Sequence, residues 1–225
     1  MKSLLKTSLL TTLFIVTLTG PVAYAQVSDT TTHSFATTLE EQTEIKEGTS
    51  GVLAGQMVPY IQELPFTGTQ TLHYTVKNTD FIKGDNAAIL LQIPEEFTQI
   101  THLPNFLTFI SGNVSYSSIF GHEEAKLTTE IMDVSDNRII VHLPDTFWKG
   151  ETGELDEGTI SLNFVLSYGQ ILAERPDVTI PDTLIGYEFQ AKLKYSAQEW
   201  DEQTEPLNAT VEETYITSDT SAIVK

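Results

Sequence analysis

The run from Ala87 to Ile93 is apolar at nearly every position, and Pro94 follows it at once. The run is much shorter than the roughly 20 residues of a membrane-spanning helix. A strand with this composition is covered by the rest of the protein on both faces. We therefore expect Ala87–Ile93 to be a central strand. Pro94 should mark a corner, and a short acidic turn should follow it.

A second apolar segment follows that corner. It contains Phe106, Phe109, Ile110 and Val114. We expect this segment to be a strand that begins at Leu103–Asn105 and ends near Tyr116. The two strands form the centre around which we place the rest of the chain.

Three other segments of the chain alternate between apolar and polar residues. In Leu72–Val76, Leu72, Tyr74 and Val76 share one face, while His73 and Thr75 share the other. Ile160–Tyr168 and Tyr187–Tyr195 alternate in the same way. Such alternation is typical of antiparallel strands with one face on a core and one face in water.

The remaining strand signals are weaker. Lys126–Ile131 and Arg138–Leu143 are predicted to form a hairpin around a turn at Asp133–Asn137. Val52–Leu64 and Leu207–Thr217 are predicted strands near the two ends of the folded part. No amphipathic helix of ordinary length and no internal repeat is visible, which favours an all-β antiparallel sandwich or barrel over an α/β fold.

The first 25 residues have the pattern of a secretory signal peptide. Lys2 and Lys6 precede the apolar stretch Leu9–Leu18, and Ala23-Tyr24-Ala25 forms a small-residue cleavage site. The mature chain should therefore begin at Gln26. We divide the chain into a signal peptide (1–25), a flexible leader (26–38), one β domain (39–217) and a C-terminal tail (218–225). Whether residues 39–64 join the main sandwich remains open at this point.

The charge of the chain excludes several classes of partner. It has 12 Lys and Arg residues against 31 Asp and Glu residues, a formal net charge of -19. Two of the lysines lie in the signal peptide, so the mature chain has a charge near 10 − 31 = -21. Nucleic acids and anionic membrane surfaces would repel such a protein. The chain has no cysteine, which excludes disulfides and thiolate sites and fits exported proteins of Gram-positive bacteria.

Four segments in order resemble one known class of domain. They are Leu72–Asn78 (LHYTVKN), Leu91–Phe97 (LQIPEEF), Phe109–Val114 (FISGNV) and Gly158–Phe164 (GTISLNF). The series is similar to the immunoglobulin-like, adhesin-type domains of Gram-positive secreted and cell-surface proteins. It covers about Thr69–Val211 and consists of framework motifs. The resemblance implies an immunoglobulin-like sandwich and an extracellular location, and it names no ligand.

Leu64–Gly68 reads LPFTG and so matches the sortase recognition pentapeptide. A sorting signal needs an apolar span and a basic tail after the pentapeptide. Here Thr69-Gln70-Thr71 and a predicted strand follow instead. We interpret the match as a Pro-Gly turn that leads into a strand.

No catalytic or metal-binding pattern stands out. The five histidines (His33, His73, His102, His122 and His142) lack the spacing of paired metal ligands. The adjacent acids Glu95-Glu96, Glu123-Glu124 and Glu212-Glu213 would point to opposite faces of a strand. Asp133, Asp136 and Asn137 lack the fuller pattern of a calcium loop, so whether a Ca²⁺ site exists near Asp133 and Asp136 stays open. We expect no enzyme activity and no cofactor.

The best binding candidates are Trp148 and Trp200, which lie in acidic, polar loops. An exposed Trp stacks on sugar rings or anchors a protein contact, whereas a buried Trp caps the core. We expect a secreted, non-enzymatic binding module at or near the cell surface, which is either released or held at the cell wall by non-covalent partners. Its partner would be an extracellular protein or a cell-wall glycan, with no membrane span in the mature chain.

Two alternatives to this function are kept. The first is a structural subunit of an extracellular fibre or matrix, in which the leader or the final strand pairs with the open sheet edge of a neighbour. The second, ranked last, is a secreted carbohydrate-active enzyme. That enzyme would need two carboxylates converging across about 5–9.5 Å, which a sequence cannot show.

The signal peptide gives the first testable prediction. Mature protein from the native host should begin at Gln26, as measured by N-terminal sequencing and intact mass. Replacing Ala23 and Ala25 together by Leu should leave the precursor uncleaved, because the peptidase requires small residues there. Val22→Leu is the control and should be processed normally. A mature protein that retains residues 1–25 would contradict the assignment.

Overall fold

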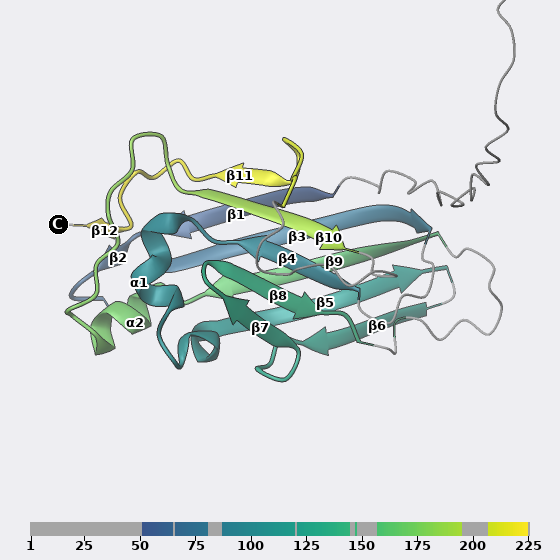
Figure 1. Cartoon of the computed structure of the whole chain (residues 1–225), viewed down its shortest axis with the longest axis horizontal. Helices are drawn as coiled ribbons and strands as arrows, with labels where there is room; N and C mark the ends of the chain where they lie inside the picture. The colour runs from purple at the N-terminus through teal and green to yellow at the C-terminus, as the bar shows by residue number, and fades with distance from the viewer. Residues whose placement is uncertain are drawn as a thin grey trace, which may run out of the picture. The chain divides into compact units, whose positions relative to one another are not determined.

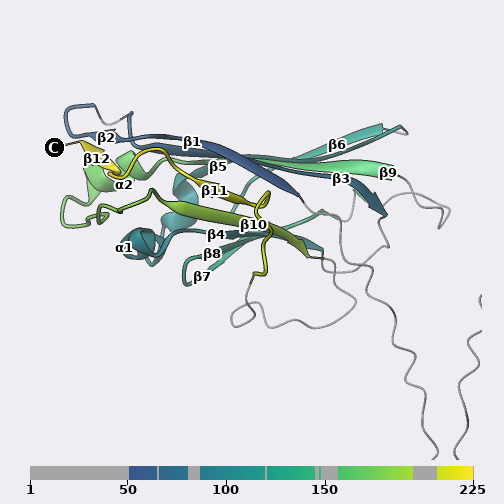
Figure 2. The same cartoon turned by 90° about the horizontal axis from the view of Figure 1, so that it is seen from above.

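The computed structural model describes residues 51–64, 66–80, 87–119, 121–144, 147, 157–194 and 207–224. These residues belong to one compact unit that extends from Ile45 to Lys225. Two five-stranded antiparallel sheets stack face to face in this unit (Figures 1 and 2). The prediction of an all-β sandwich is therefore confirmed. The signal peptide and the leader lie outside the described residues.

Sheet 1 has the strand order β1-β3-β9-β5-β6. Its strands, in chain order, are β1 (Val52–Val58), β3 (Thr69–Asp80), β5 (Ile110–Ser118), β6 (Gly121–Lys126) and β9 (Glu157–Leu166). Each neighbouring pair is antiparallel. β9 is therefore the central strand of this sheet, although it comes last of the five along the chain.

Sheet 2 has the strand order β11-β10-β4-β8-β7. Its strands, in chain order, are β4 (Ala88–Gln92), β7 (Met132–Ser135), β8 (Arg138–His142), β10 (Glu188–Lys194) and β11 (Thr214–Ile216). Two short strands, β2 (Tyr60–Ile61) and β12 (Ile223–Val224), pair in parallel. The helical segments are η1 (Glu95–Phe97), α1 (Thr98–Thr101), η2 (Phe106–Phe109) and α2 (Tyr168–Glu174). No helix in the described part of the chain is long and apolar enough to cross a membrane.

The inward faces of the two sheets form the core. In sheet 1, register places Leu72 opposite Phe164, Tyr74 opposite Leu162 and Val76 opposite Ile160, and all six side chains are buried. Such apolar cross-strand pairs are the unit by which antiparallel sheets are stabilised. The alternation predicted for Leu72–Val76 is therefore confirmed, and so is that of Ile160–Leu166.

β4 is covered on both faces, as its apolar composition predicts. Ile89 and Leu91 belong to the main core between the sheets. Ala88 and Leu90 point to the other side, where they pack with Ile140 and Leu207 in a second, small cluster. The second cluster forms because the chain crosses the outer face of sheet 2 around residue 207.

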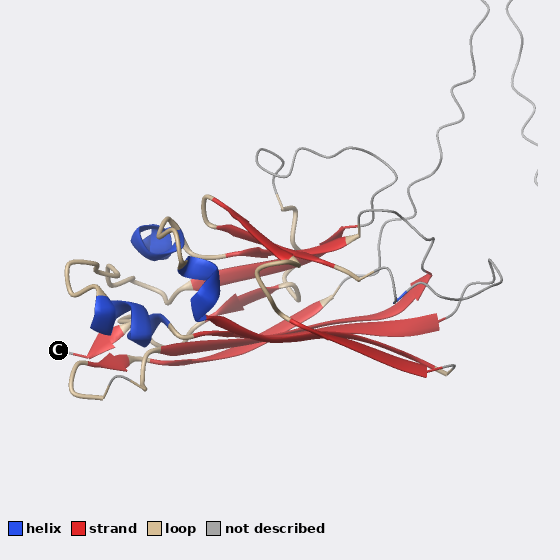
Figure 3. Ribbon diagram, turned by 90° about the horizontal axis from the view of Figure 1, so that it is seen from below, coloured by secondary structure: helices blue, strands red, loops and turns tan. Residues whose placement is uncertain are grey.

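The acidic turn predicted after Pro94 is the short 3-10 turn η1, but the predicted start of a strand at Leu103 is wrong. The chain from Glu95 to Phe109 forms η1, α1 and η2 instead, at one end of the sandwich (Figure 3). Buried Phe97 makes edge-to-face contacts with Tyr168 and Tyr187, at centroid distances of 5.6 and 5.4 Å. The three-residue spacing of Phe97 and Ile100 puts both side chains on the same side of a helical turn, and both are buried.

The predicted hairpin is displaced. Lys126–Ile131 does not form its first strand, because β6 ends at Lys126 and Leu127 donates its backbone N–H to Gly112. The hairpin is formed by β7 and β8, joined by Asp136 and Asn137. Asp136 has a φ of 51°. A positive φ in a two-residue hairpin loop matches the right-handed twist of the flanking strands.

The strand predicted for Ile160–Tyr168 ends at Leu166, and Tyr168 begins α2. Gly169 donates its backbone N–H to Gly68 at 2.7 Å, and a Cβ at position 169 would lie 1.9 Å from the Thr67 carbonyl oxygen. This close approach holds α2 against the LPFTG turn. In that turn Thr67 donates its backbone N–H to Leu64 at 2.9 Å. The pentapeptide thus connects β2 to β3, as the turn interpretation requires.

The final strand is shorter than predicted. Only Thr214–Ile216 of the predicted Leu207–Thr217 forms a strand, and it pairs with β10 of its own chain. The segment interpreted as a tail contains β12, which pairs with β2. Two tyrosine hydroxyls fix the same region: Tyr168 donates to the Ala222 carbonyl, and Tyr187 accepts from the Ala222 N–H. β1 places residues 52–58 in sheet 1, while β2 pairs with β12 in a separate two-stranded sheet.

A buried carboxylate joins the two sheets. Glu213 has no solvent exposure, and its carboxylate accepts hydrogen bonds from the Tyr74 hydroxyl at 2.9 Å and from the Lys192 ammonium at 2.8 Å. The backbone N–H groups of Gly51 and Thr210 donate to it at 3.0 Å each. Tyr74 belongs to sheet 1 and Lys192 to sheet 2, so one side chain bridges both layers.

Glu213 gives a prediction about acid stability. Burial opposes its charged form, but the donors from Lys192, Thr210, Gly51 and Tyr74 outweigh burial and lower its pKa in the folded protein. A lowered folded pKa adds stability above the unfolded value of about 4.3 and loses it as the pH falls through the folded value. Glu213→Gln should cost about 2–3 kcal/mol at pH 7, because it leaves the Lys192 ammonium without its counter-charge.

Denaturant unfolding at pH 7 and at pH 3 measures this effect. The difference between wild type and Glu213→Gln should shrink as the pH falls, because acid protonates the wild-type carboxylate. Glu212→Gln is the matched control, since Glu212 is exposed, and it should unfold like the wild type at both pH values. A difference that stays constant from pH 7 to pH 3 would contradict the assigned role.

Candidate functional site

Several sequence-predicted site residues lie outside the described residues. These are the two binding candidates Trp148 and Trp200, the cleavage-site residues Ala23, Ala25 and Gln26, and His33. The structure therefore leaves their roles as predictions.

The three oxygen donors considered for Ca²⁺ are engaged separately. Asp133 lies 2.8 Å from His142 across the β7–β8 pair. The carboxylate of Asp136 lies 3.8 Å from His102. The Asn137 side chain is buried and contacts Thr98 and Thr101. Within the described parts of the chain, no group of three or more potential ligands of the His, Cys, Asp and Glu type could hold a metal ion.

The adjacent acids do not act as pairs. Glu212 is exposed while its neighbour Glu213 is fully buried in the bridge between the sheets. Glu95 and Glu96 lie in η1, and Glu123 and Glu124 lie on the edge strand β6. Glu213 is the one buried carboxylate among these described acids, and its hydrogen bonds to Tyr74 and Lys192 give it a structural role.

The outer face of sheet 1 carries a continuous polar surface. On β3, β9 and β5 the outward positions are hydroxyl, amide or imidazole residues almost throughout. Register aligns His73, Asn163 and Asn113 in one row and Thr75, Ser161 and Ser115 in the next. We call this surface, from Ala54 on β1 to Lys126 on β6, the polar face.

Side chains of the polar face form one chain of hydrogen bonds across four neighbouring strands. The Thr75 hydroxyl lies 2.9 Å from His73 Nε2, and His73 Nδ1 lies 2.7 Å from Asn163 Oδ1. Asn163 donates to Asn113 at 2.9 Å, and Asn113 donates to the Glu124 carboxylate at 2.7 Å. The chain thus links β3, β9, β5 and β6.

The hydrogen bond to Asn163 fixes which nitrogen of His73 donates. Asn163 Oδ1 only accepts, so His73 Nδ1 carries a proton; in the neutral imidazole, Nε2 then accepts from Thr75. Every donor then points along the sheet toward Glu124, the one carboxylate in the chain of bonds. Hydrogen bonds arranged head to tail polarise one another, and they hold the side chains in one arrangement.

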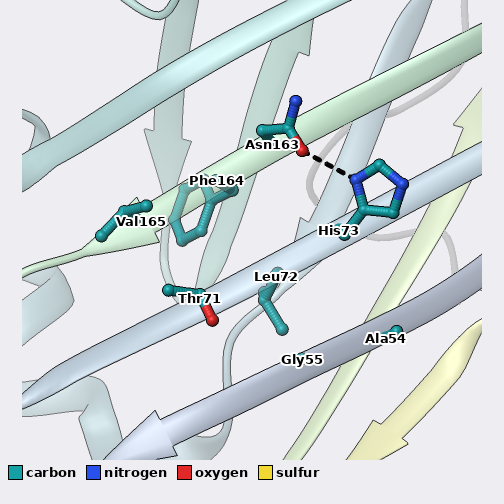
Figure 4. A pocket seen from close by; sticks show the side chains of 8 residues that line it. All are labelled: Ala54, Gly55, Thr71, Leu72, His73, Asn163, Phe164 and Val165. Carbon is teal, nitrogen blue, oxygen red and sulfur yellow. Dashed lines mark hydrogen bonds between the residues drawn. The ribbon is translucent and has the colours of Figure 1, made fainter.

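A shallow hollow of about 330 Å³ lies over β3 in the polar face. Small residues on β1 leave this space beside the imidazole of His73, and Figure 4 shows the His73–Asn163 hydrogen bond at its edge. It is lined from β1, β3 and β9 by Ala54, Gly55, Thr71, Leu72, His73, Asn163, Phe164 and Val165. The lining includes no carboxylate, so the hollow lacks the acid and base of a glycosidase site.

The polar face is nearly uncharged on a strongly acidic protein. Among its described outward side chains, Lys77 and Lys126 are positive and Glu124 is negative. The whole chain has a formal net charge of -19. The polar face is therefore a region where a ligand meets hydrogen-bonding groups with little net charge.

Sequence reasoning placed His73 on an outward face but missed the polar face as a site. Its signal is present: outward positions of three alternating strands are almost all Ser, Thr, Asn or His. The strand order is needed to see that these polar positions lie on one continuous surface. β3, β9 and β5 are separated by long stretches of sequence, yet they are direct neighbours in sheet 1.

Comparison with known proteins finds a distant likeness among solved structures. No protein family model matches the chain, and no curated protein does. Among solved structures, the N-terminal domain of the Streptococcus gordonii adhesin Sgo0707 is similar, with a TM-score of 0.34 and 8% sequence identity. The match covers 78% of this chain and 32% of that one, so the chain spans about a third of the length of that structure.

The hydrogen-bond chain can be tested in solution. Asn163→Ala removes the acceptor of His73 and the donor to Asn113. His73 should then lose its preference for the Nδ1–H tautomer, as measured from its imidazole nitrogen shifts by NMR. Because the site is exposed, the free energy of unfolding should change by less than about 1 kcal/mol.

Asn105→Ala is the matched control, because Asn105 is an exposed Asn away from the polar face. It should leave the His73 signals unchanged. Identical His73 nitrogen shifts in wild type and Asn163→Ala would show that the chain of bonds does not exist in solution.

Proposed function

We propose that this protein is a secreted, non-enzymatic, adhesin-like binding module with an immunoglobulin-like sandwich, acting at or near the surface of a Gram-positive bacterium. The observation that carries the proposal is the polar face of sheet 1. Its donors and acceptors are fixed by neighbouring side chains before any partner arrives. A surface held in this way loses little conformational entropy when a partner binds.

The sandwich supports a binding role because its two outer faces differ. The outer face of sheet 2 is covered in part by the chain around Leu207, which packs on Leu90 and Ile140. The outer face of sheet 1 has its hollow and its row of exposed polar groups. Among the described residues, the outer face of sheet 1 is exposed at Ala54, His73 and Asn163, which supports its use in binding.

Several features of the sequence support an extracellular location. The signal-peptide pattern in residues 1–25 and the absence of cysteine fit an exported protein of a Gram-positive bacterium. The acidic surface favours solubility outside the cell. The LPFTG sequence lies between β2 and β3 within the fold, so we infer that it does not act as a sorting signal.

The fibre alternative loses one of its two routes. β11 pairs with β10 and β12 pairs with β2 within the same chain, so the final strand is already in use. The exposed edge strand β6 carries His122, Glu123, Glu124 and Lys126, and such charged residues disfavour pairing between edges. Pairing through the leader is the route that stays a hypothesis.

Fractionation of the native host tests the proposal. We expect mature protein mainly in the wall fraction, from which salt or denaturant releases it. Purified mature protein should bind whole host cells or their isolated walls. It should also release no reducing ends from a panel of polysaccharides, because the hollow has no carboxylate pair. Hydrolysis of any member of the panel, or a protein confined to the cytoplasm, would overturn the proposal.

A further inference from the structure

We propose that the ligand of the polar face is a neutral glycan strand that lies across sheet 1 and seats one sugar unit in the hollow beside His73. This inference rests on the proposed function, because it names the partner of that same binding surface. It follows from the hydrogen-bonding chemistry, the hollow and the charge of the face.

The hydrogen-bonding groups suit a polyhydroxyl ligand. Asn163 and Asn113 each use one N–H of the amide in the chain of bonds, and an amide nitrogen carries two. The second N–H of each is available to a sugar hydroxyl. Hydroxyl, amide and imidazole groups both donate and accept, as do sugar hydroxyls, so many local pairings are satisfied without an ion.

The hollow suits the less polar side of a sugar ring. Its volume of about 330 Å³ lies at the lower end of the roughly 300–1,000 Å³ typical of ligand pockets. Ala54 and Val165 supply apolar side chains to the hollow, while Thr71, His73 and Asn163 supply polar groups. A ring that places its C–H groups on the apolar lining keeps its hydroxyls within reach of those polar groups.

Charge favours a neutral strand over a polyanion. The described outward side chains of the polar face carry two positive charges and one negative charge. A polyanion would gain little from this face and would be repelled by the rest of a chain with net charge -19. A neutral strand meets no such repulsion and removes few charges from water.

The polar face also lacks the usual anchors of protein interfaces. Binding energy between proteins concentrates in buried Trp, Tyr and Arg side chains. None of these types occurs among the described outward residues of the polar face.

The five strands of sheet 1 span about 19 Å at a spacing of about 4.8 Å, which leaves room for several sugar units in a row.

The test is affinity electrophoresis of the mature full chain in gels containing one polysaccharide each. Dextran, laminarin and galactomannan are the neutral probes, and polygalacturonate is the acidic probe. We expect at least one neutral polysaccharide to retard the wild type and polygalacturonate not to do so. The apparent Kd is then measured by titration of that polysaccharide.

Two variants localise the site in different ways. Asn163→Ala removes hydrogen-bonding groups, while Ala54→Leu fills the hollow and removes none. Ala54 is exposed on β1, so the larger side chain should not disturb the core. Each variant should weaken binding about tenfold, and Asn105→Ala, the control, should bind like the wild type. Circular dichroism and thermal melting confirm that all three variants fold.

The outcomes separate the inference from the proposed function. If the face variants bind the neutral polysaccharide as tightly as the control, the site is wrong. If only polygalacturonate retards the chain, or if no probe does while isolated walls still bind it, the neutral-glycan inference is overturned and the binding function stands. If neither polysaccharides nor walls bind the chain, the proposed function falls with it.

Discussion

The apolar layer between the two sheets is the interaction on which every other feature of this molecule depends. The inward residues of β3 and β9 pair across sheet 1, and β4 and β10 supply the facing layer from sheet 2. With no disulfide to restrain the unfolded chain, burial of these side chains has to supply the stability. The helical turns around Phe97 and α2 then close one end of this layer with aromatic contacts.

The same alternation that builds the core also builds the polar face. In a strand, successive side chains point to opposite faces, so a strand whose odd positions face water places every second residue on one outer surface. Because β3, β9 and β5 are in register, their polar positions align into rows and bond to each other. The core therefore holds the polar face in one geometry, which is what the proposed binding role requires.

The buried carboxylate of Glu213 and the exposed carboxylate of Glu124 have different roles in this protein. Glu213 is buried where the sheets meet, and its carboxylate is satisfied by donors from both layers. Leaving any of those donors without a partner would cost more than the interaction gains when it is intact. Glu124 ends a chain of bonds at the surface, where water is available to its oxygens. Glu213 links the two sheets to each other, and Glu124 orients the side chain of Asn113 on the polar face.

The sequence predicted the strands whose pattern is set by local alternation, and it failed where long-range contacts decide. Leu72–Val76 and Ile160–Leu166 have the expected faces. The segment after Pro94 was predicted as a turn and a strand but is helical, because Phe97 and Ile100 find a common apolar site among Tyr168 and Tyr187. The Lys126–Ile131 alternation was misleading in the same way, since the true hairpin begins only at Met132.

Composition and alternation alone determined the all-β class, the acidic surface and the double burial of β4, because these depend on which residue types follow one another. Strand order depends instead on which segments, far apart in the chain, can share one apolar layer. That order alone decided that Asn163 lies beside both His73 and Asn113, and that Glu213 reaches Tyr74 and Lys192. The candidate site exists only once the core has brought these segments together.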